Sequence, residues 1–140
     1  MPSTINGQIE RITCHNEENG FSILKLKVRG HRELIKAVGS FMAPTAGQVI
    51  RATGEWINHP KHGEQFTIVQ YTTMVPATAA GIEKYLGSGL IKGISPVMAK
   101  RIVKFFGEKT LDIIEQNCER LSKVDGIGDK RVKMIWKAWN

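Results

Sequence analysis

Hydrophobic and polar positions alternate through the first half of the chain, and this period of two residues is typical of β-strands. Two such runs, residues 6–13 and 21–28, flank a segment that ends in Asn19 and Gly20. Both of these residues tolerate positive φ, so the segment is predicted to form a hairpin turn. Three further strand-like runs cover residues 33–40, 48–57 and 64–72.

Five short strands within residues 1–75 predict a small antiparallel β-barrel, with the OB-fold as the leading candidate. On the second strand Phe21, Lys25 and Lys27 share one face, because successive side chains of a strand alternate. An exposed aromatic ring beside lysines fits a surface on which nucleic-acid bases stack, and Lys61 in a later loop is a further candidate contact. Two glutamates in the preceding loop would repel phosphate, so docking of the barrel against another domain is the alternative.

The loop between the last two predicted strands carries His59 and His62. A closed zinc site needs four ligands, and two histidines without further ligands nearby rarely form one. We therefore predict no metal here, and a loop that supports the barrel or contacts a partner. On the adjoining strands, Trp56 and Phe66 share faces with apolar residues and are predicted to lie in the core.

From residue 76 onwards apolar positions recur every three or four residues, which predicts helices with one buried face. One helix is predicted to begin at Pro96 behind a Ser95 cap and to end at Gly107. Its predicted inward positions are Val97, Ala99, Ile102, Val103 and Phe106. A continuous run over residues 110–121 is predicted to bury Leu111, Ile114, Cys118 and Leu121. The last helix, beginning near Asp129, is predicted to bury Val132, Ile135, Trp136 and Trp139.

The helical half contains an internal repeat. Aligning Gly93 with Gly126 shows a Gly-Ile pair that recurs after 33 residues. Ankyrin repeats have a similar period, but their Thr-Pro-Leu-His turn is absent. The better description is two helical hairpins with tight turns near residues 92–96 and 125–129. The predicted fold class is therefore α+β in two parts, with an all-α domain over residues 76–140.

The net charge of the chain indicates what kind of partner it binds. The chain of 140 residues has a formal net charge of +7, and it is unevenly distributed. Residues 1–75 carry eight Lys or Arg against six Asp or Glu, whereas residues 76–140 carry twelve against seven. An excess of this kind indicates a polyanionic partner, most often nucleic acid.

The second hairpin combines flexible and charged residues in one place. Gly126 and Gly128 precede a helix that carries Lys130, Arg131 and Lys133. Glycine permits close approach of a ligand, and the first N–H groups of a helix lack intrahelical partners at the positive end of its dipole. We predict that the amides of Lys130 and Arg131 hold one backbone phosphate while the cations attract it. A purely structural turn is the alternative.

The first hairpin departs from this pattern. Ser95 replaces the second glycine, and two apolar residues, Val97 and Met98, stand where the second hairpin has Lys and Arg. Gly93 and Ser95 are therefore predicted to bind phosphate more weakly or to serve only the structure.

Several classes of function are disfavoured. The chain has no G-x-x-x-x-G-K-[ST] sequence for ATP and no catalytic set, so it is predicted not to hydrolyse ATP or cut DNA by itself. No apolar run approaches the roughly 18 residues of a membrane span, and no signal peptide is visible. Cys14 and Cys118 are far apart in sequence, which favours reduced thiols and a cytoplasmic location.

Three features of the sequence resemble known DNA-binding proteins. The stretch "VDGIG" resembles the helix-hairpin-helix motif, which holds nucleic-acid backbones through main-chain amides. Five strands followed by two such motifs are similar to the DNA-binding region of the RuvA Holliday-junction protein. More specifically, "CHNEENGFSILKLKV", "GEWINHPKHGEQF" and "GIEKYLGSGLIKGISPVMAKRIVKFFG" resemble the amino-terminal region of RecD-like ATP-dependent DNA helicases, the long type that works without RecBC.

The resemblance to RecD-like helicases implies a sequence-independent DNA-binding accessory region of a 5′–3′ helicase of DNA repair and recombination. Motor domains would follow Asn140, and ATP and Mg²⁺ would belong to them, so no cofactor is expected in this chain. The implied partners are those motor domains and single-stranded, duplex or forked DNA, with no membrane. The alternatives are a self-assembling scaffold similar to RuvA, and a protein-docking module that does not contact DNA.

Overall fold

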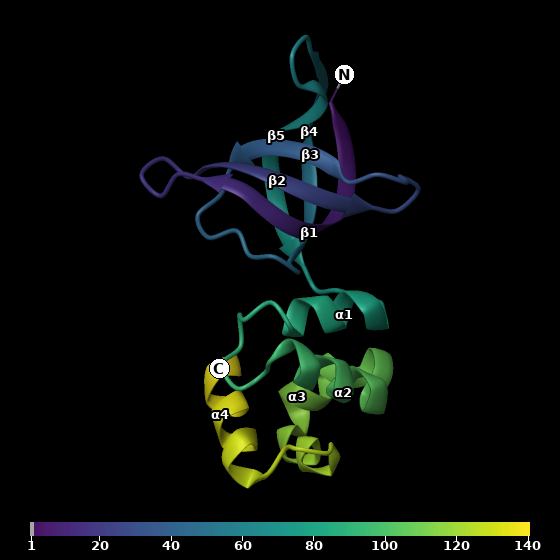
Figure 1. Cartoon of the computed structure of the whole chain (residues 1–140), viewed down its shortest axis with the longest axis vertical. Coiled ribbons are helices and arrows are strands. Elements are labelled where there is room, and N and C mark those ends of the chain that lie inside the picture. Colours follow the sequence, from purple (N-terminus) through teal and green to yellow (C-terminus); the bar gives the residue numbers. More distant parts are fainter. Residues whose placement is uncertain (1) are drawn as a thin grey trace. The chain divides into compact units, whose positions relative to one another are not determined.

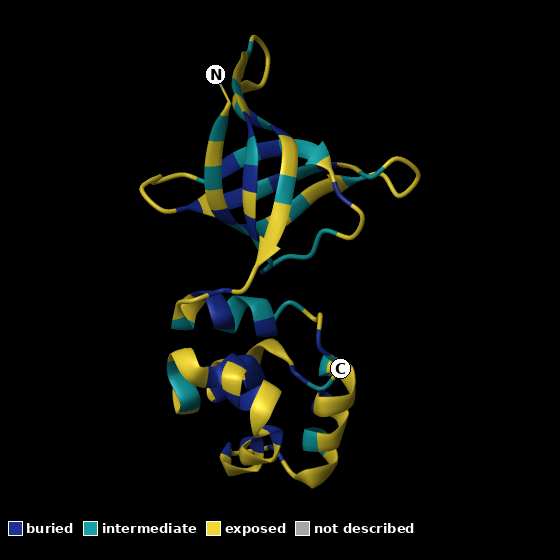
Figure 2. Ribbon diagram, turned by 180° about the vertical axis from the view of Figure 1, so that it is seen from behind, coloured by how far each residue is buried: buried dark blue, intermediate teal, exposed yellow. Residues whose placement is uncertain are grey.

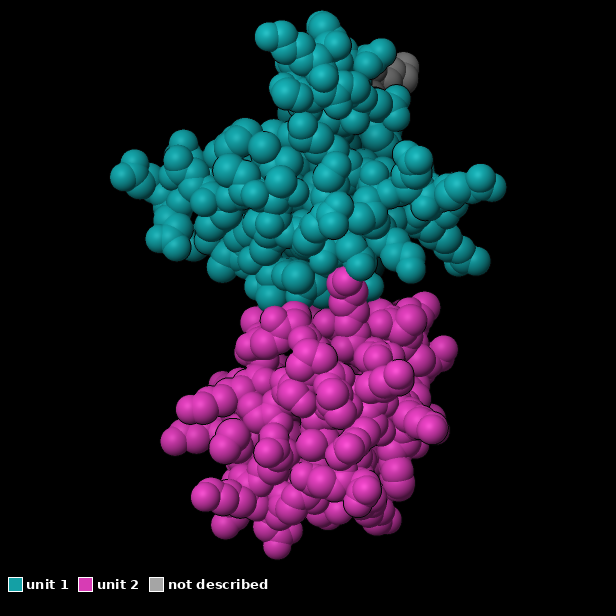
Figure 3. Space-filling view, in the orientation of Figure 1, with its two compact units in different colours: residues 1–75 teal, residues 76–140 magenta. Residues whose placement is uncertain are grey.

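A β-barrel and a group of short helices make up the chain, which divides between Val75 and Pro76 (Figures 1 and 3). The computed structural model describes residues 2–140, and each unit has its own hydrophobic core. The strands are β1 Ser3–His15, β2 Phe21–Val28, β3 Ile35–Ser40, β4 Val49–His59 and β5 Gly63–Met74.

The five strands close into a ring in the order β1-β2-β3-β5-β4. Four of the pairings are antiparallel, and β3 pairs with β5 in parallel through Ala37 with Phe66 and Val38 with Thr67. A ring with an odd number of strands cannot alternate direction at every pairing, so one pair has to be parallel. The predicted five-stranded barrel is confirmed, and the β3–β5 seam is its single parallel pairing.

Alternation of buried and exposed residues along the strands builds the barrel core (Figure 2). On β2 the side chains of Leu24 and Leu26 are fully buried, whereas Lys27 is exposed. Phe66 is fully buried as predicted, and half-buried Trp56 packs edge-on against it with ring centroids 5.0 Å apart. The hydrophobic residues of the first unit therefore face inward, and the outer faces of the strands remain open to other contacts.

The second unit is a set of short helices around one core. Its elements are α1 Ala79–Leu86, α2 Pro96–Phe106, the 3₁₀ turn η1 Gly107–Lys109, α3 Thr110–Gln116, the 3₁₀ helix η2 Cys118–Lys123 and α4 Asp129–Trp139. The predicted limits of α2 are confirmed, because Ser95 Oγ accepts the N–H of Met98 at 3.1 Å and Gly107 ends the helix at φ 62°. No helix within residues 2–140 has the length and apolar character needed to cross a membrane.

Three details of the helical prediction are wrong. Val97 is 62% exposed, because the buried stripe of α2 is centred on Ile102 and places Met98 inward instead. Trp136 is 43% exposed, since α4 contacts the core through the face that carries fully buried Ile135, and the next residue lies about 100° around the helix from it. The predicted continuous helix over residues 110–121 breaks at Asn117, whose φ of −143° is not helical.

The two hairpins contain equivalent turns. The N–H of Ile94 donates to the carbonyl of Ile91 at 3.2 Å, and 33 residues later the N–H of Ile127 donates to Val124 at 3.1 Å. The third residue of each turn is a glycine with positive φ, 103° and 89° respectively, as a type II turn requires. Because the four apolar residues are buried, both turns are anchored in the core of the second unit.

The pairing of β4 with β5 shifts register between Thr53 and Gly54, and this close approach of the strands leads to a stability prediction. A β-carbon on Gly54 would lie 1.9 Å from the carbonyl oxygen of Thr67, a contact that only movement of the backbone can relieve. We expect Gly54→Ala to lower the free energy of unfolding of the barrel by about 1–3 kcal/mol, the usual cost of overpacking. A urea titration followed through the amide NMR signals of β4 and β5 measures this. Glu55→Ala, at an exposed position next to Gly54 on the same strand, is the control, and an equal loss in both variants would contradict the prediction.

Candidate nucleic-acid interface

The amino terminus of α4 presents a group of unused backbone donors. The first intrahelical bond of α4 runs from the N–H of Val132 to the carbonyl of Gly128 at 3.0 Å, and Gly128 provides no side-chain cap. Among residues 2–140 no acceptor pairs with the N–H groups of Gly128, Asp129, Lys130 and Arg131. Such donors at the positive end of a helix dipole form a site that favours anions.

The two glycines of the second hairpin have different surroundings. A β-carbon on Gly128 would meet nothing within 4 Å, so its backbone is open to solvent. A β-carbon on Gly126 would lie 2.9 Å from Nη1 of Arg101, which comes from α2. Gly126 therefore shapes the turn and admits a guanidinium group, whereas Gly128 leaves room for a ligand at the helix terminus.

An arginine from each repeat reaches the hairpin of the other. Arg131 on α4 donates from Nη1 to the carbonyl of Gly93 at 2.9 Å, and Arg101 on α2 donates from Nη1 to the carbonyl of Asp125 at 3.4 Å. The two arginines occupy the third position of α4 and the sixth position of α2. The side chain of Arg131 is thus committed to the first hairpin, although its backbone N–H belongs to the second.

Lysines form an exposed stripe on α4. Lys130, Lys133 and Lys137 recur at i, i+3 and i+7 on the face opposite buried Ile135. No ion pair links these lysines to an acidic residue anywhere in the described chain, so their positive charge is not neutralised within the protein.

The same repeat places lysines on α2. Lys100 and Lys104 are exposed and lie 33 residues before Lys133 and Lys137. Lys100, Lys104 and Lys137 were not identified from the sequence, although the alignment of Gly93 with Gly126 already places these lysines at equivalent positions of the repeat. Arg101 was also missed, and only the fold brings it beside the second hairpin.

The first hairpin leaves fewer donors free. Pro96 has no N–H, and the N–H of Met98 is occupied by the Ser95 side chain. The N–H of Ala99 makes the first intrahelical bond, to the carbonyl of Ser95 at 2.8 Å. Within the first turn of α2 this leaves only the N–H of Val97. Gly93 is also enclosed, since a β-carbon there would lie 3.1 Å from Cγ1 of Ile135.

The barrel carries a second candidate surface on the outer side of β2, β3 and β5. A shallow groove of about 500 Å³ lies there, and Phe21, 42% exposed, forms part of its lining together with Val38, Thr67, Val69 and Tyr71. The predicted lysines do not line this groove. Lys25 is four residues further along β2 from Phe21, about 13 Å at the rise of a strand.

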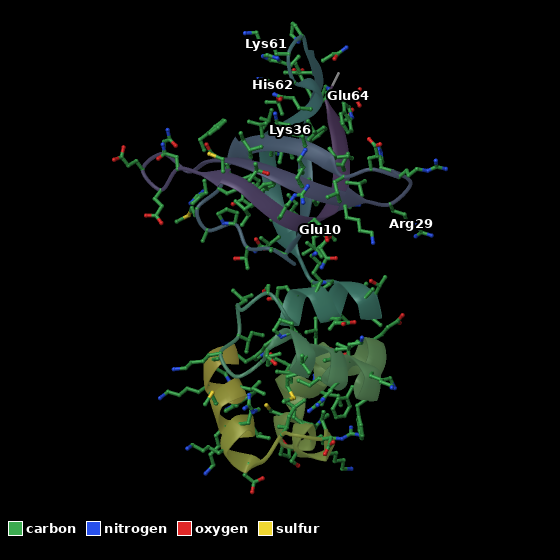
Figure 4. All side chains as sticks on the ribbon, in the orientation of Figure 1. Glu10, Arg29, Lys36, Lys61, His62 and Glu64 are labelled. Atoms are coloured by element: carbon green, nitrogen blue, oxygen red, sulfur yellow. The ribbon has the colours of Figure 1, made fainter. Side chains whose placement is uncertain are left out.

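Strand register brings three cations into one row. Lys25 pairs with Arg11 on β1 and with Lys36 on β3, of which Lys36 is labelled in Figure 4. Like charges directly opposite each other destabilise a sheet, and none of the three has an ion-pair partner among residues 2–140. A row of this kind is suited to an anionic ligand. Arg11 and Lys36 were not identified from the sequence, because their alignment with Lys25 depends on the register.

Lys61 lies away from this row, in the loop between β4 and β5 together with His62 (Figure 4). The rings of His59 and His62 are 4.7 Å apart, and Nδ1 of His59 accepts the N–H of Lys61 at 3.1 Å. No cluster of three or more potential metal ligands occurs in the part of the chain that the structure describes.

Comparison with known proteins gives two family matches. The OB-fold domain of the ATP-dependent DNA helicase YrrC matches residues 2–76, and the SAM-like tandem helix-hairpin-helix family matches residues 86–140. The ATP-dependent RecD2 DNA helicase of Deinococcus radiodurans is 21% identical over 99% of this chain. The chain corresponds to 20% of the length of that helicase.

One structural neighbour is the crystal structure of the S. pombe Stn1-ten1 complex. It aligns with a TM-score of 0.43 and 13% identity, covering 54% of this chain and 59% of the other.

The arginine contact to the first hairpin leads to a testable prediction. Arg131→Lys keeps the charge but removes the planar guanidinium, so we expect the bond to the Gly93 carbonyl to be lost. Because a hydrogen bond from a charged donor contributes about 1.5–3 kcal/mol, the N–H of Ile94 should exchange with solvent about tenfold or more faster, while that of Ile127 is unaffected. Hydrogen exchange read by NMR measures both amides. Equal acceleration at Ile94 and Ile127 would show that the contact does not hold the first turn.

The row of Arg11, Lys25 and Lys36 on the barrel leads to a second testable prediction. Lys36→Thr removes a like charge beside Lys25, and we expect the free energy of unfolding to rise by about 0.2–1 kcal/mol at low salt. The gain should shrink at high salt, where the repulsion is screened. Lys27→Thr is the matched control, because Lys27 pairs with Gln8 instead of a cation on β1. A similar change in both variants would rule out repulsion within the row.

Proposed function

The chain belongs to the family of the OB-fold domain of the ATP-dependent DNA helicase YrrC, and we propose on this premise that it grips DNA for a RecD-like helicase. The grip is independent of base sequence, because backbone amides contact the sugar-phosphate chain and do not read the bases. Separate motor domains hydrolyse ATP with Mg²⁺ and move 5′ to 3′ in the cytoplasm during repair and recombination, whereas this region has no catalysis of its own.

The observation that carries this proposal is the set of four unpaired N–H groups at the start of α4. They lie beside exposed Gly128, next to lysines without ion-pair partners. One phosphate accepts the N–H groups of Lys130 and Arg131, and the side chains of Lys130 and Lys133 add electrostatic attraction. Asp129 lies on the same turn and moderates the affinity by repulsion.

The first hairpin contributes less to the grip. With Pro96 in the first turn and Ser95 capping Met98, Gly93 and Ser95 mainly set the geometry of the turn. On the barrel, Phe21 supplies a stacking surface and the row around Lys25 supplies phosphate contacts, with Lys27 and Lys61 at more distant positions. The grip thus centres on the second hairpin, with the barrel as a second contact for single-stranded, duplex or forked DNA.

A salt titration of DNA binding tests the proposal. Each phosphate contact contributes about 0.9 to the slope of log K against log salt on duplex, and about 0.7 on single strands. We expect the double variant Lys130→Ala, Lys133→Ala to flatten the duplex slope by up to about 1.8 and to retain the wild-type circular dichroism spectrum. Fluorescence anisotropy with single-stranded, duplex and forked DNA gives the slopes.

The control is the substitution of Lys109, which lies on η1 in the same unit. It removes a positive charge at a position far in sequence from both turns. Lys109→Ala should leave the slope nearly unchanged. An equal loss of slope in both variants would reduce the effect to net charge and remove the second hairpin from the proposal. A folded chain that binds none of the three DNAs would identify a protein-docking module, and concentration-dependent assembly in light scattering would favour a scaffold similar to RuvA.

A further inference from the structure

A cavity of about 280 Å³ opens between α4 and the η2 segment. Of the lysine stripe on α4, only Lys133 lines this cavity. Its walls are Gln116, Cys118, Glu119, Val132, Lys133 and Trp136. Pockets for drug-sized ligands range upward from about 300 Å³, so this volume suits one planar ring system. Trp136 stands 43% exposed at its edge, where the sequence predicted a buried residue.

The walls of the cavity are held in place by contacts between the helices. The thiol of Cys118 donates to the carbonyl of Val132 at 3.9 Å, and the indole N–H of Trp139 donates to the carboxylate of Glu115. Burial raises the pKa of the Cys118 thiol, and the charge of Glu119 raises it further, so the thiol stays neutral at physiological pH. The floor of the cavity is therefore uncharged and suited to an apolar surface.

The polar groups around this floor match the edges of a nucleobase. The amide of Gln116 can both donate and accept, and the carboxylate of Glu119 can accept from the ring N3–H of thymine or from the exocyclic amino group of another base. The indole of Trp136 offers a face on which a base stacks, and Lys133, three residues before it on the same side of α4, can contact the adjoining phosphate. An aromatic ring beside a cation is the arrangement that binds single strands.

The distance from the second hairpin fits a continuous DNA strand. Trp136 is six positions after Lys130, and at a rise of about 1.5 Å per residue this is about 9 Å along α4. Stacked nucleotides of one strand are about 3.4 Å apart, so a strand held at the hairpin reaches the cavity within about three nucleotides.

We propose that this cavity binds one unpaired base of DNA, stacked on Trp136 with its edge toward Gln116 and Glu119. The inference rests on the proposed grip of the second hairpin, and it adds a contact that requires a base and not only a phosphate. A base inside a duplex cannot enter the cavity, so the site favours single-stranded DNA at a fork.

The test compares an oligothymidylate with an abasic oligonucleotide of equal length, which has the same phosphates but no bases. We expect the 140-residue chain to bind the oligothymidylate more tightly. Trp136→Ala should weaken that binding by about fivefold to 100-fold, the range for loss of base stacking, and leave binding of the abasic strand unchanged. The salt slope should not change, since no phosphate contact is removed.

Two further variants sharpen the result. Trp136→Phe keeps a smaller ring and should retain part of the preference for the oligothymidylate. Phe105→Ala removes an aromatic residue from α2 that is 54% exposed and lines none of the cavity, so it should have no effect.

The outcomes separate this inference from the proposed function. Equal binding of both oligonucleotides by the wild-type chain, or equal weakening of both by Trp136→Ala, would overturn the base site and leave the phosphate grip intact. Unchanged DNA binding by Trp136→Ala, with loss of binding to separately supplied motor domains, would overturn it in favour of a protein contact. Failure of the wild-type chain to bind either strand, and to bind duplex or forked DNA as well, would refute the proposed function itself.

Discussion

The helical unit depends on two glycine turns, and buried apolar side chains on either side of each turn fix its backbone in place. Gly93 and Gly126 adopt positive φ, which side-chain-bearing residues rarely do, and the residues on either side of each turn are buried in the common core. Because both turns close on the same core, buried side chains hold the start of α2 and the start of α4 in place. The proposed phosphate contact at α4 requires that rigidity, since the free N–H groups of a helix terminus bind an anion only where the helix begins at a defined residue.

Two turns of the same shape nevertheless have different chemistry. Ser95 and Pro96 consume or remove donors at the start of α2, whereas Gly128 leaves the donors at the start of α4 unpaired. Each arginine contacts the turn of the other repeat: Arg131 from the second repeat holds the turn of the first hairpin, and Arg101 from the first repeat lies against the second. We infer that the two hairpins have different roles: the first stabilises the unit, and the second binds the phosphate.

The barrel follows a different constraint. Closure of five strands imposes the parallel β3–β5 seam, and the antiparallel registers of β2 with β1 and with β3 align Arg11, Lys25 and Lys36 across three strands. Aligned cations cost stability, and they are tolerated here on an open outer face beside the groove that Phe21 lines. Both units therefore keep positive charge unneutralised where a strand of DNA can reach it, and the cavity beside Trp136 adds a feature that phosphate alone does not explain.

The sequence by itself determined the two-part architecture, the five strands, the limits of α2, the 33-residue repeat and the resemblance to RecD-like helicases, which the family match confirms. These follow from local periodicity and turn chemistry, which neighbouring residues encode. The tertiary structure alone decided the exposure of Val97 and Trp136, the break at Asn117, the crossing arginines and the cation row. Each of these depends on which surfaces meet across long separations in the chain, and helical or strand periodicity carries no information about that.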